Sequence, residues 1–269
     1  MAYVAPSELG MKMVDAGEKK IKMGTRDCLI RAYMAGAILA LAAVFAVTIS
    51  VQSGSPLAGA ILFPVGFCML YLMGFDLLTG VFVLTPLAWL DKRKDVTLWR
   101  ILKHWFFVFC GNFAGAITTA VLMAIVFTYG FSIDPGPVGQ KLATIGEART
   151  LGYAQYGAQG WLTIFIRGCL CNWMVSLGVV GAMISTTVTG KVVAMWMPIM
   201  LFFYMGFEHS IVNMYLFPSG LMMGGDFSFL DYIIWNEIPV VVGNLVGGVT
   251  LTGLTVYTTH VRTAPEHIF

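Results

Sequence analysis

The chain of 269 residues is 58% hydrophobic, and it carries 16 Lys and Arg against 14 Asp and Glu. Charged residues make up 11% of it, where soluble domains carry about 25%, so this composition excludes an ordinary soluble globular protein. The net charge of +2 is uninformative by itself, and no nucleic-acid partner is predicted. The first 25 residues are polar and lack the apolar core of a secretory signal, so we expect a multi-pass protein of the cytoplasmic membrane.

Long segments without Asp, Glu, Lys or Arg predict the membrane-spanning helices, because about 20 helical residues cross a hydrocarbon core of about 30 Å. The longest segment, 32–75, is divided by the turn residues Gln-Ser-Gly-Ser-Pro at 52–56, so it contributes to two spans. The sequence therefore predicts an all-α membrane protein with six spans, at about 28–51, 57–90, 101–130, 159–186, 192–217 and 232–260.

The predicted elements follow in chain order from residue 1 to residue 269. They are a cytoplasmic amphipathic helix (1–25), three spans (26–130), an extracytoplasmic loop (131–157), three further spans (158–261) and a cytoplasmic tail (262–269). Both termini are predicted to be cytoplasmic, because all Lys and Arg except Lys141, Arg149 and Arg167 then lie on that side. The first helix is either an anchor in the membrane surface or a gate at the cytoplasmic mouth. Its apolar face is predicted to carry Leu9, Met13, Val14, Ala16 and Ile21.

The two sets of spans are internal repeats, since residues 132 positions apart match. The matches are Gly36 with Gly168, Met73-Gly74-Phe75-Asp76 with Met205-Gly206-Phe207-Glu208, Pro86 with Pro218, and Gly111, Asn112 and Gly115 with Gly243, Asn244 and Gly247. Three spans are an odd number, so the second repeat is inverted in the membrane. Inverted repeats are typical of transporters and channels.

Spans two and five are predicted to be broken at matching positions. Asp76 and Thr79-Gly80 interrupt span two, and Glu208-His209-Ser210 interrupt span five. A second half-helix that begins inside the membrane directs the positive end of its dipole inward, which favours an anion. We therefore expect a substrate path between the two breaks.

Polar side chains inside the spans are costly, so each needs a partner or a role. Asp76, Glu208 and Arg167 are predicted to form a buried ionic and hydrogen-bonded network that holds the broken helices. The repeat-related Asn112 and Asn244 are expected to bond backbone groups exposed by the breaks. His209 lies at a predicted break, which favours a role in the pore over that of an ordinary core histidine.

The aromatic residues and cysteines have less specific interpretations. Phe75, Phe202 and Phe207 flank the breaks, where they either narrow a pore or simply pack. The five cysteines lie in or beside apolar spans and are expected to be small buried hydrophobes. No metal site, disulfide or cofactor is predicted.

The segment Gly206-Phe207-Glu208-His209-Ser210-Ile211-Val212-Asn213-Met214 strongly resembles the formate/nitrite transporter family. Further matches are Leu77-Leu78-Thr79, Gly111-Asn112-Phe113-Ala114-Gly115, Arg167-Gly168-Cys169-Leu170-Cys171-Asn172-Trp173 and Gly243-Asn244-Leu245-Val246-Gly247. The resemblance covers about 25–260. It implies a homopentamer with an aquaporin-like fold, one pore in each protomer, and passage of small monovalent anions such as formate, nitrite or hydrosulfide.

The resemblance also implies roles for individual residues. His209 is central to the pore, Thr79 lies on a flexible loop in the broken helix with Leu77 and Leu78 beside it, and the N-terminal helix responds to pH. Asn172 and Asn213 belong to the polar surroundings. Where many members carry a lysine that attracts anions, this chain has Tyr156, so the attraction is expected to be weaker or to come from Lys141 or Arg149.

Two competing functions stay open from the sequence. A neutral-solute channel of the aquaporin type also uses inverted repeats, but its paired Asn-Pro-Ala motifs are missing here. A membrane redox enzyme needs haem ligands at matching depth, and His104 and His260 lie at the cytoplasmic edge of their spans. We therefore predict a proton-linked anion channel, with small anions, protons and the lipid bilayer as its partners, rather than an enzyme.

Overall fold

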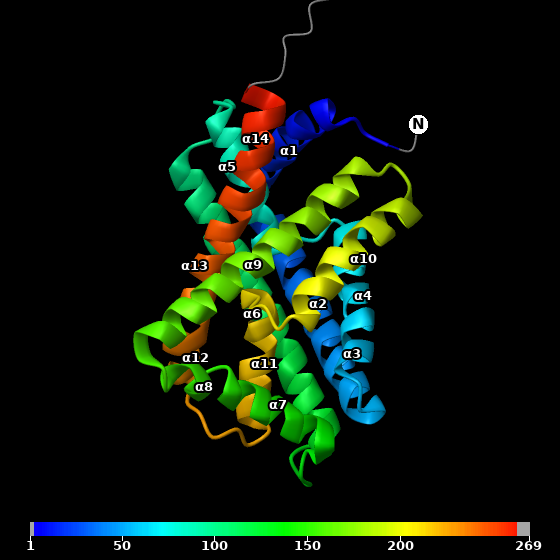
Figure 1. The fold of residues 1–269 in the computed structure, drawn as a ribbon, viewed down its shortest axis with the longest axis vertical. Helices are drawn as coiled ribbons and strands as arrows, with labels where there is room; N and C mark the ends of the chain where they lie inside the picture. The colour runs from blue at the N-terminus through cyan, green and yellow to red at the C-terminus, as the bar shows by residue number, and fades with distance from the viewer. Residues whose placement is uncertain (1–2, 263–269) are drawn as a thin grey trace, which may run out of the picture.

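The computed structural model describes residues 3–262, which fold into helices joined by turns (Figure 1), and the predicted all-α class is confirmed. The first helices are α1 (Pro6–Ile21), α2 (Thr25–Ser53), α3 (Pro56–Leu62), α4 (Pro64–Leu72), α5 (Leu78–Leu90) and α6 (Leu98–Thr128). Those that follow are α7 (Gly136–Ala148), α8 (Leu151–Ala154), α9 (Gly157–Ile184), α10 (Val188–Tyr204), α11 (Ser210–Met222), α12 (Phe229–Tyr232), α13 (Ile238–Val246) and α14 (Thr255–Tyr257). Three π-helical segments, η1 (Ile233–Glu237), η2 (Gly247–Leu254) and η3 (Thr258–Arg262), join the last helices into one rod.

Within residues 3–262, four helical stretches are long and apolar enough to cross a membrane. They are Thr25–Ser53, Leu98–Thr128, Gly157–Ile184 and Phe229–Arg262, and they match the predicted spans one, three, four and six. The segment 57–90 is instead divided among α3, α4 and α5, and the segment 192–217 is divided between α10 and α11. The predicted tail at 262–269 lies outside the described residues apart from Arg262.

The helices α4 and α10 end in the same way. Gly74 and Gly206 follow their last turns in the left-handed conformation, with φ of 72° and 64°, which glycine adopts without steric cost. In α4, the N–H of Phe75 donates to the carbonyl of Leu70 at 2.9 Å, and the equivalent bond after α10 measures 3.0 Å. This is the hydrogen bond of a Schellman motif. The chain then runs extended until α5 and α11 begin.

Glycines allow the long helices to cross in backbone contact. A Cβ atom on Gly36 of α2 would lie 2.1 Å from a carbonyl oxygen of α6, and one on Gly115 of α6 would lie 2.0 Å from a carbonyl oxygen of α2. Gly243 and Gly247 approach α9 in the same manner, at 2.4 and 2.1 Å. Small residues four positions apart, such as Gly243 and Gly247, are typical of close helix packing in membranes. The repeat-related glycines thus fix the frame that holds the breaks.

The amphipathic helix α1 lies at the same end of the molecule as α14 (Figure 1). Its buried side carries Leu9, Gly10, Met13, Val14, Gly17 and Ile21, whereas the predicted Ala16 is only half-buried. A Cβ atom on Gly17 would lie 2.2 Å from the carbonyl oxygen of Leu84 in α5. The helix is therefore docked directly on α5.

Helices also occur in the segment predicted as an extracytoplasmic loop. α7 and α8 occupy most of 131–157 and lie at the end of the molecule opposite α1 (Figure 1). Leu142 of α7 is fully buried, and its carbonyl oxygen would lie 2.9 Å from a Cβ atom on Gly220 of α11. This segment is part of the packed molecule because α7 covers the end of α11.

Candidate functional site

The two breaks meet at His209 and Thr79. His209 is the N-cap of α11 and is 2% exposed, and Thr79 is fully buried in the first turn of α5. The Nε2 atom of His209 lies 3.1 Å from Oγ1 of Thr79, and its Nδ1 atom accepts the backbone N–H of Val212 at 3.2 Å. Because Nδ1 accepts, the ring proton of the neutral histidine lies on Nε2 and points towards Thr79.

Asn112 holds the first break together. Its Oδ1 atom accepts the N–H of Leu78, the first residue of α5, at 3.0 Å. Its Nδ2 atom donates to the carbonyl of Asp76 at 2.9 Å and to the carbonyl of Ala32 in α2 at 2.7 Å. One buried amide therefore satisfies an uncapped helix start and an exposed carbonyl in the break, as expected from the sequence.

Asn244 forms the matching contacts at the second break. Its Oδ1 atom accepts the N–H of Ser210 at 2.9 Å, and its Nδ2 atom donates to the carbonyl of Glu208 at 2.9 Å. A further bond joins Nδ2 to the carbonyl of Gly168 in α9 at 2.8 Å. The pattern repeats that of Asn112, so the backbone of both breaks is held in the same way.

Asn172 of α9 connects the two halves. Its Nδ2 atom donates to the carbonyl of Thr79 at 3.2 Å and to the carbonyl of Asn244 at 2.6 Å. The side chain is fully buried, and Ser176 one turn later donates to its Oδ1 atom at 3.5 Å. The polar contacts of Asn172 are therefore with the backbone of Thr79 and of Asn244.

The carboxylate of the first break, Asp76, forms an ion pair with Lys20 of α1. Asp76 is 1% exposed and the side chain of Lys20 is 22% exposed, so the pair is largely removed from water. Lys20 was not assigned this role from the sequence, because a helical pattern does not show that a long side chain reaches beneath its own helix. Lys20 joins α1 to the break.

The carboxylate of the second break, Glu208, lies in a separate cluster at the α7 end. Its Oε2 atom accepts Nδ2 of Asn213 at 2.9 Å and lies 3.5 Å from a guanidinium nitrogen of Arg149, the residue that follows α7. Its Oε1 atom accepts the hydroxyl of Tyr153 in α8 at 3.3 Å. Burial raises the pKa of Tyr153 to about 12, with the charge of Glu208 adding to the effect, so the phenol remains a donor.

Arg167 joins only part of the expected network, since hydrogen bonds through Tyr153 link it to Glu208 whereas Asp76 pairs with Lys20. Its side chain is exposed, and its guanidinium donates to the hydroxyl of Tyr153 at 2.7 Å. A long cationic side chain extends its charged end outward to polar surroundings, which explains why Arg167 is exposed although it lies within α9. Arg167 therefore acts on Glu208 only through Tyr153.

Other residues at this end of the molecule differ in their burial and in their partners. Of the two cations predicted to compensate for Tyr156, Arg149 contacts Glu208 whereas Lys141 is exposed on α7. Tyr156 is 63% exposed. Glu237 is 4% exposed, because η1 continues the last helix and carries this residue inward.

The buried carboxylate of Glu237 accepts hydrogen bonds from hydroxyl groups. Ser210 donates to its Oε1 atom, and Tyr232 donates to its Oε2 atom at 2.7 Å. Asn236, its neighbour, accepts Nδ2 of Asn213 at 2.7 Å. Neither Glu237 nor Asn236 was singled out from the sequence, although both lie within the first turns of the predicted span 232–260.

The apolar side chains near the contact between His209 and Thr79 differ in how deeply they are buried. The ring of Phe202 stacks on His209 with centroids 5.6 Å apart, and Phe202 is 2% exposed. Phe75 and Phe207 are half-buried in the two extended segments. Leu77 and Leu78 are buried at the start of α5. Of the predicted aromatic residues, Phe202 is the one that contacts the histidine ring.

A small cavity lies on the α1 side of the first break. Its volume is about 60 Å³, and its lining includes Lys20, Phe75, Asp76 and Leu77. One wall is thus a charged pair and the rest is largely apolar. This chemistry suits a small ion that keeps one polar contact while it leaves water.

Comparisons with known proteins identify the family. A family model described as formate/nitrite transporter matches residues 7–258. The chain is 29% identical to a probable formate transporter of Methanothermobacter thermautotrophicus, over 97% of this chain and 98% of that protein. It is 33% identical to the formate channel FocA of Haemophilus influenzae, over 82% of each. It is also 34% identical to formate-nitrite transporter 2 of Toxoplasma gondii, of which it spans 55%.

Two solved structures share the fold. An ion channel of the FNT family superposes with a TM-score of 0.80 at 22% identity, over 93% of this chain and 98% of that one. A pentameric formate channel with formate bound gives a TM-score of 0.72 at 24% identity, over 87% and 96%. With the family model matching nearly its full length, the chain belongs to the formate/nitrite transporter family, whose members are membrane channels and transporters rather than enzymes.

Proposed function

We propose that this protein passes small monovalent anions, formate or nitrite, across the cytoplasmic membrane together with a proton. The observation that carries the proposal is the contact between His209 and Thr79, which joins the starts of α11 and α5. Helix N-termini carry partial positive charge, so two that meet inside the molecule favour an anion between them. The relatives named as formate channels and transporters support the same substrate class.

We propose that His209 orients the anion through its Nε2–H group. Its Nδ1 atom is occupied by the N–H of Val212, so protonation there requires the loss of a buried hydrogen bond. The neutral ring still offers one directed donor, beside the hydroxyl of Thr79. A proton would then follow through water, and the pair would cross the apolar surroundings of Phe202 and Leu77 without net charge.

The further parts of the proposal concern the assembly and its orientation. Two inverted three-helix repeats, broken between α4 and α5 and between α10 and α11, would form one pore in each protomer of a homopentamer. The related pentameric formate channel supports this assembly. Positive residues around α1 and 92–103 support cytoplasmic termini. Phe75 and Leu77 would then face the cytoplasmic mouth, and Phe207 and Glu208 the outer one.

His209→Asn tests the role of the histidine without removing its cap. The shorter amide still accepts the N–H of Val212, because asparagine is a preferred N-cap, but it offers nothing at the position of Nε2. In proteoliposomes loaded with a pH-sensitive dye, we expect formate-driven proton uptake to fall at least about tenfold. Thr118→Ala, which removes one exposed hydrogen bond within α6, should behave as wild type. Unchanged uptake by a pentameric His209→Asn protein would refute the assigned role.

A further inference from the structure

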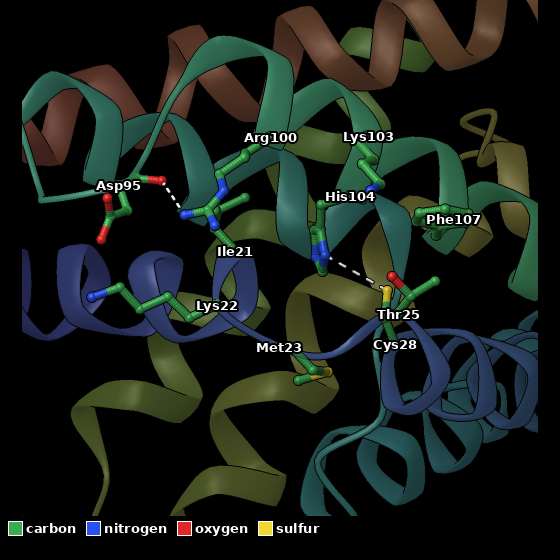
Figure 2. A pocket seen from close by; sticks show the side chains of 10 residues that line it. All are labelled: Ile21, Lys22, Met23, Thr25, Cys28, Asp95, Arg100, Lys103, His104 and Phe107. Carbon is green, nitrogen blue, oxygen red and sulfur yellow. Dashed lines mark hydrogen bonds between the residues drawn. The ribbon is translucent and has the colours of Figure 1, made fainter.

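A second polar cavity lies away from the breaks, where α1 meets α2 beside the first turns of α6. Its volume is about 350 Å³, within the range of small-molecule sites. Figure 2 shows that Arg100, Lys103 and His104 line it from α6, and Lys22 lines it from the end of α1. The Asp95 carboxylate is the acid in this lining, so the pocket is cationic.

The pairing of these cations leaves positive charge in the pocket. Lys22 is paired with Glu18 at 2.5 Å. Arg100 donates instead to the main-chain carbonyl of Asp95 at 2.6 Å, which does not neutralise its charge. Lys103 lies over the ring of Phe107, with its ammonium 5.8 Å from the ring centroid. Arg100 and Lys103 are therefore both placed to receive an anion.

Buried donors add to the positive side chains. His104 is 6% exposed, its Nδ1 lies 3.6 Å from the Sγ atom of Cys28, and its Nε2 has no partner within residues 3–262. Buried polar atoms ordinarily have one. The first turn of α2 also borders the pocket at Thr25, and its N-cap, Gly24, has no side chain to satisfy the N–H groups there.

A metal ion fits this pocket poorly. Among the residues that the structure describes, no three His, Cys, Asp or Glu side chains are grouped to hold one. An oxyanion fits better, because guanidinium, ammonium and free helix N–H groups together match its several oxygens.

The surroundings indicate where such an anion comes from. Trp99 and Phe106, on α6 beside the pocket, are 73% and 62% exposed. Aromatic residues of this kind are enriched at the membrane interface, and basic pockets between spanning helices bind anionic headgroups. We propose that the pocket binds a phosphoryl group, carried by an anionic lipid whose chains cover this face of α6 or by a soluble phosphate. The bound group would hold the connection between α1 and α2, and with it the position of α1 on α5.

Binding of phosphatidylglycerol to the purified full-length protein tests the proposal by native mass spectrometry and by thermal stability. Arg100→Gln with Lys103→Gln removes two cations of the lining. Lys94→Gln with Lys191→Gln removes the same charge outside the pocket and is the matched control. We expect binding to weaken at least about tenfold in the first protein and to stay at the wild-type level in the control. Equal loss in both proteins, or no loss in either, would overturn the proposal.

Competition with sodium phosphate distinguishes a lipid headgroup from soluble phosphate as the bound group. Phosphatidylglycerol binding that millimolar phosphate does not displace assigns the pocket to lipid, and displacement assigns it to soluble phosphate. Lys103→Gln alone keeps the bond from Arg100 to the loop, so it retains the fold and should still weaken binding. The binding measurement is independent of formate flux, so its failure would leave the proposed transport function untouched.

Discussion

Replacing Asn244 with alanine should destabilise the second helix break by a predictable amount. The substitution leaves the N–H of Ser210 and the carbonyls of Glu208 and Gly168 without their partner. Asn244 is fully buried, so water does not replace these bonds. Each unsatisfied buried group costs about 1 to 3 kcal/mol, and the three together give roughly 3 kcal/mol or more. For a chain of this size, that lowers Tm by about 6 °C or more.

Thermal unfolding in detergent, followed by intrinsic fluorescence, measures the effect. Asn112→Ala should lower Tm by a similar amount, because it leaves the N–H of Leu78 and two carbonyls unpaired in the same manner. Asn244→Asp should be worse than Asn244→Ala, since a carboxylate then faces the two carbonyls. Thr118→Ala, which removes one exposed bond within α6, is the control. A Tm for Asn244→Ala equal to that of the control would refute the reasoning.

Three further outcomes follow from the peripheral helices. Lys20→Met leaves Asp76 buried without its cation and should increase protease cleavage after α1, whereas Lys20→Met with Asp76→Asn should restore resistance. Gly17→Val forces a side chain against a carbonyl of α5 and should release α1 to the same protease assay without abolishing the remaining fold. Tyr153→Phe removes a hydrogen-bond donor to Glu208. Burial raises the pKa of Tyr153 to about 12 in the folded protein. The stability that this hydroxyl contributes is therefore complete below the unfolded pKa of about 10 and is lost as pH rises through about 12. The Tm difference from wild type should therefore be constant from about pH 6 to about pH 9 and narrow above it; a difference that shrinks below pH 9 would contradict this.

The repeat explains which parts of the site the sequence could predict. Residues that match at 132 positions apart lie in equivalent surroundings, so Asn112 and Asn244 could be assigned to the breaks in advance. Gly74 and Gly206 mark where α4 and α10 end, because a left-handed residue is required there. The spans themselves followed from charge-free segments, although two of them are divided, one among α3, α4 and α5 and the other between α10 and α11.

The contacts that the sequence missed involve residues from outside the repeats or from their margins. Lys20 and Arg149 lie in or beside short polar helices, and their partners are 56 and 59 residues away in the chain. Periodicity within a helix carries no information about such distant pairs. Glu237 received no role from the sequence, because hydropathy does not reveal the hydroxyl partners that satisfy its carboxylate.

The two carboxylates at the breaks occupy matching positions, yet the cations that neutralise them are not related by the repeat. One is supplied by α1 and the other by the end of α7, at opposite ends of the molecule. A gene duplication that created the frame would have copied the acids and left their counter-ions to be acquired separately. In the proposed channel, each mouth could therefore evolve its own sensitivity to the solution it faces, while the buried amides shared by both halves stay the same.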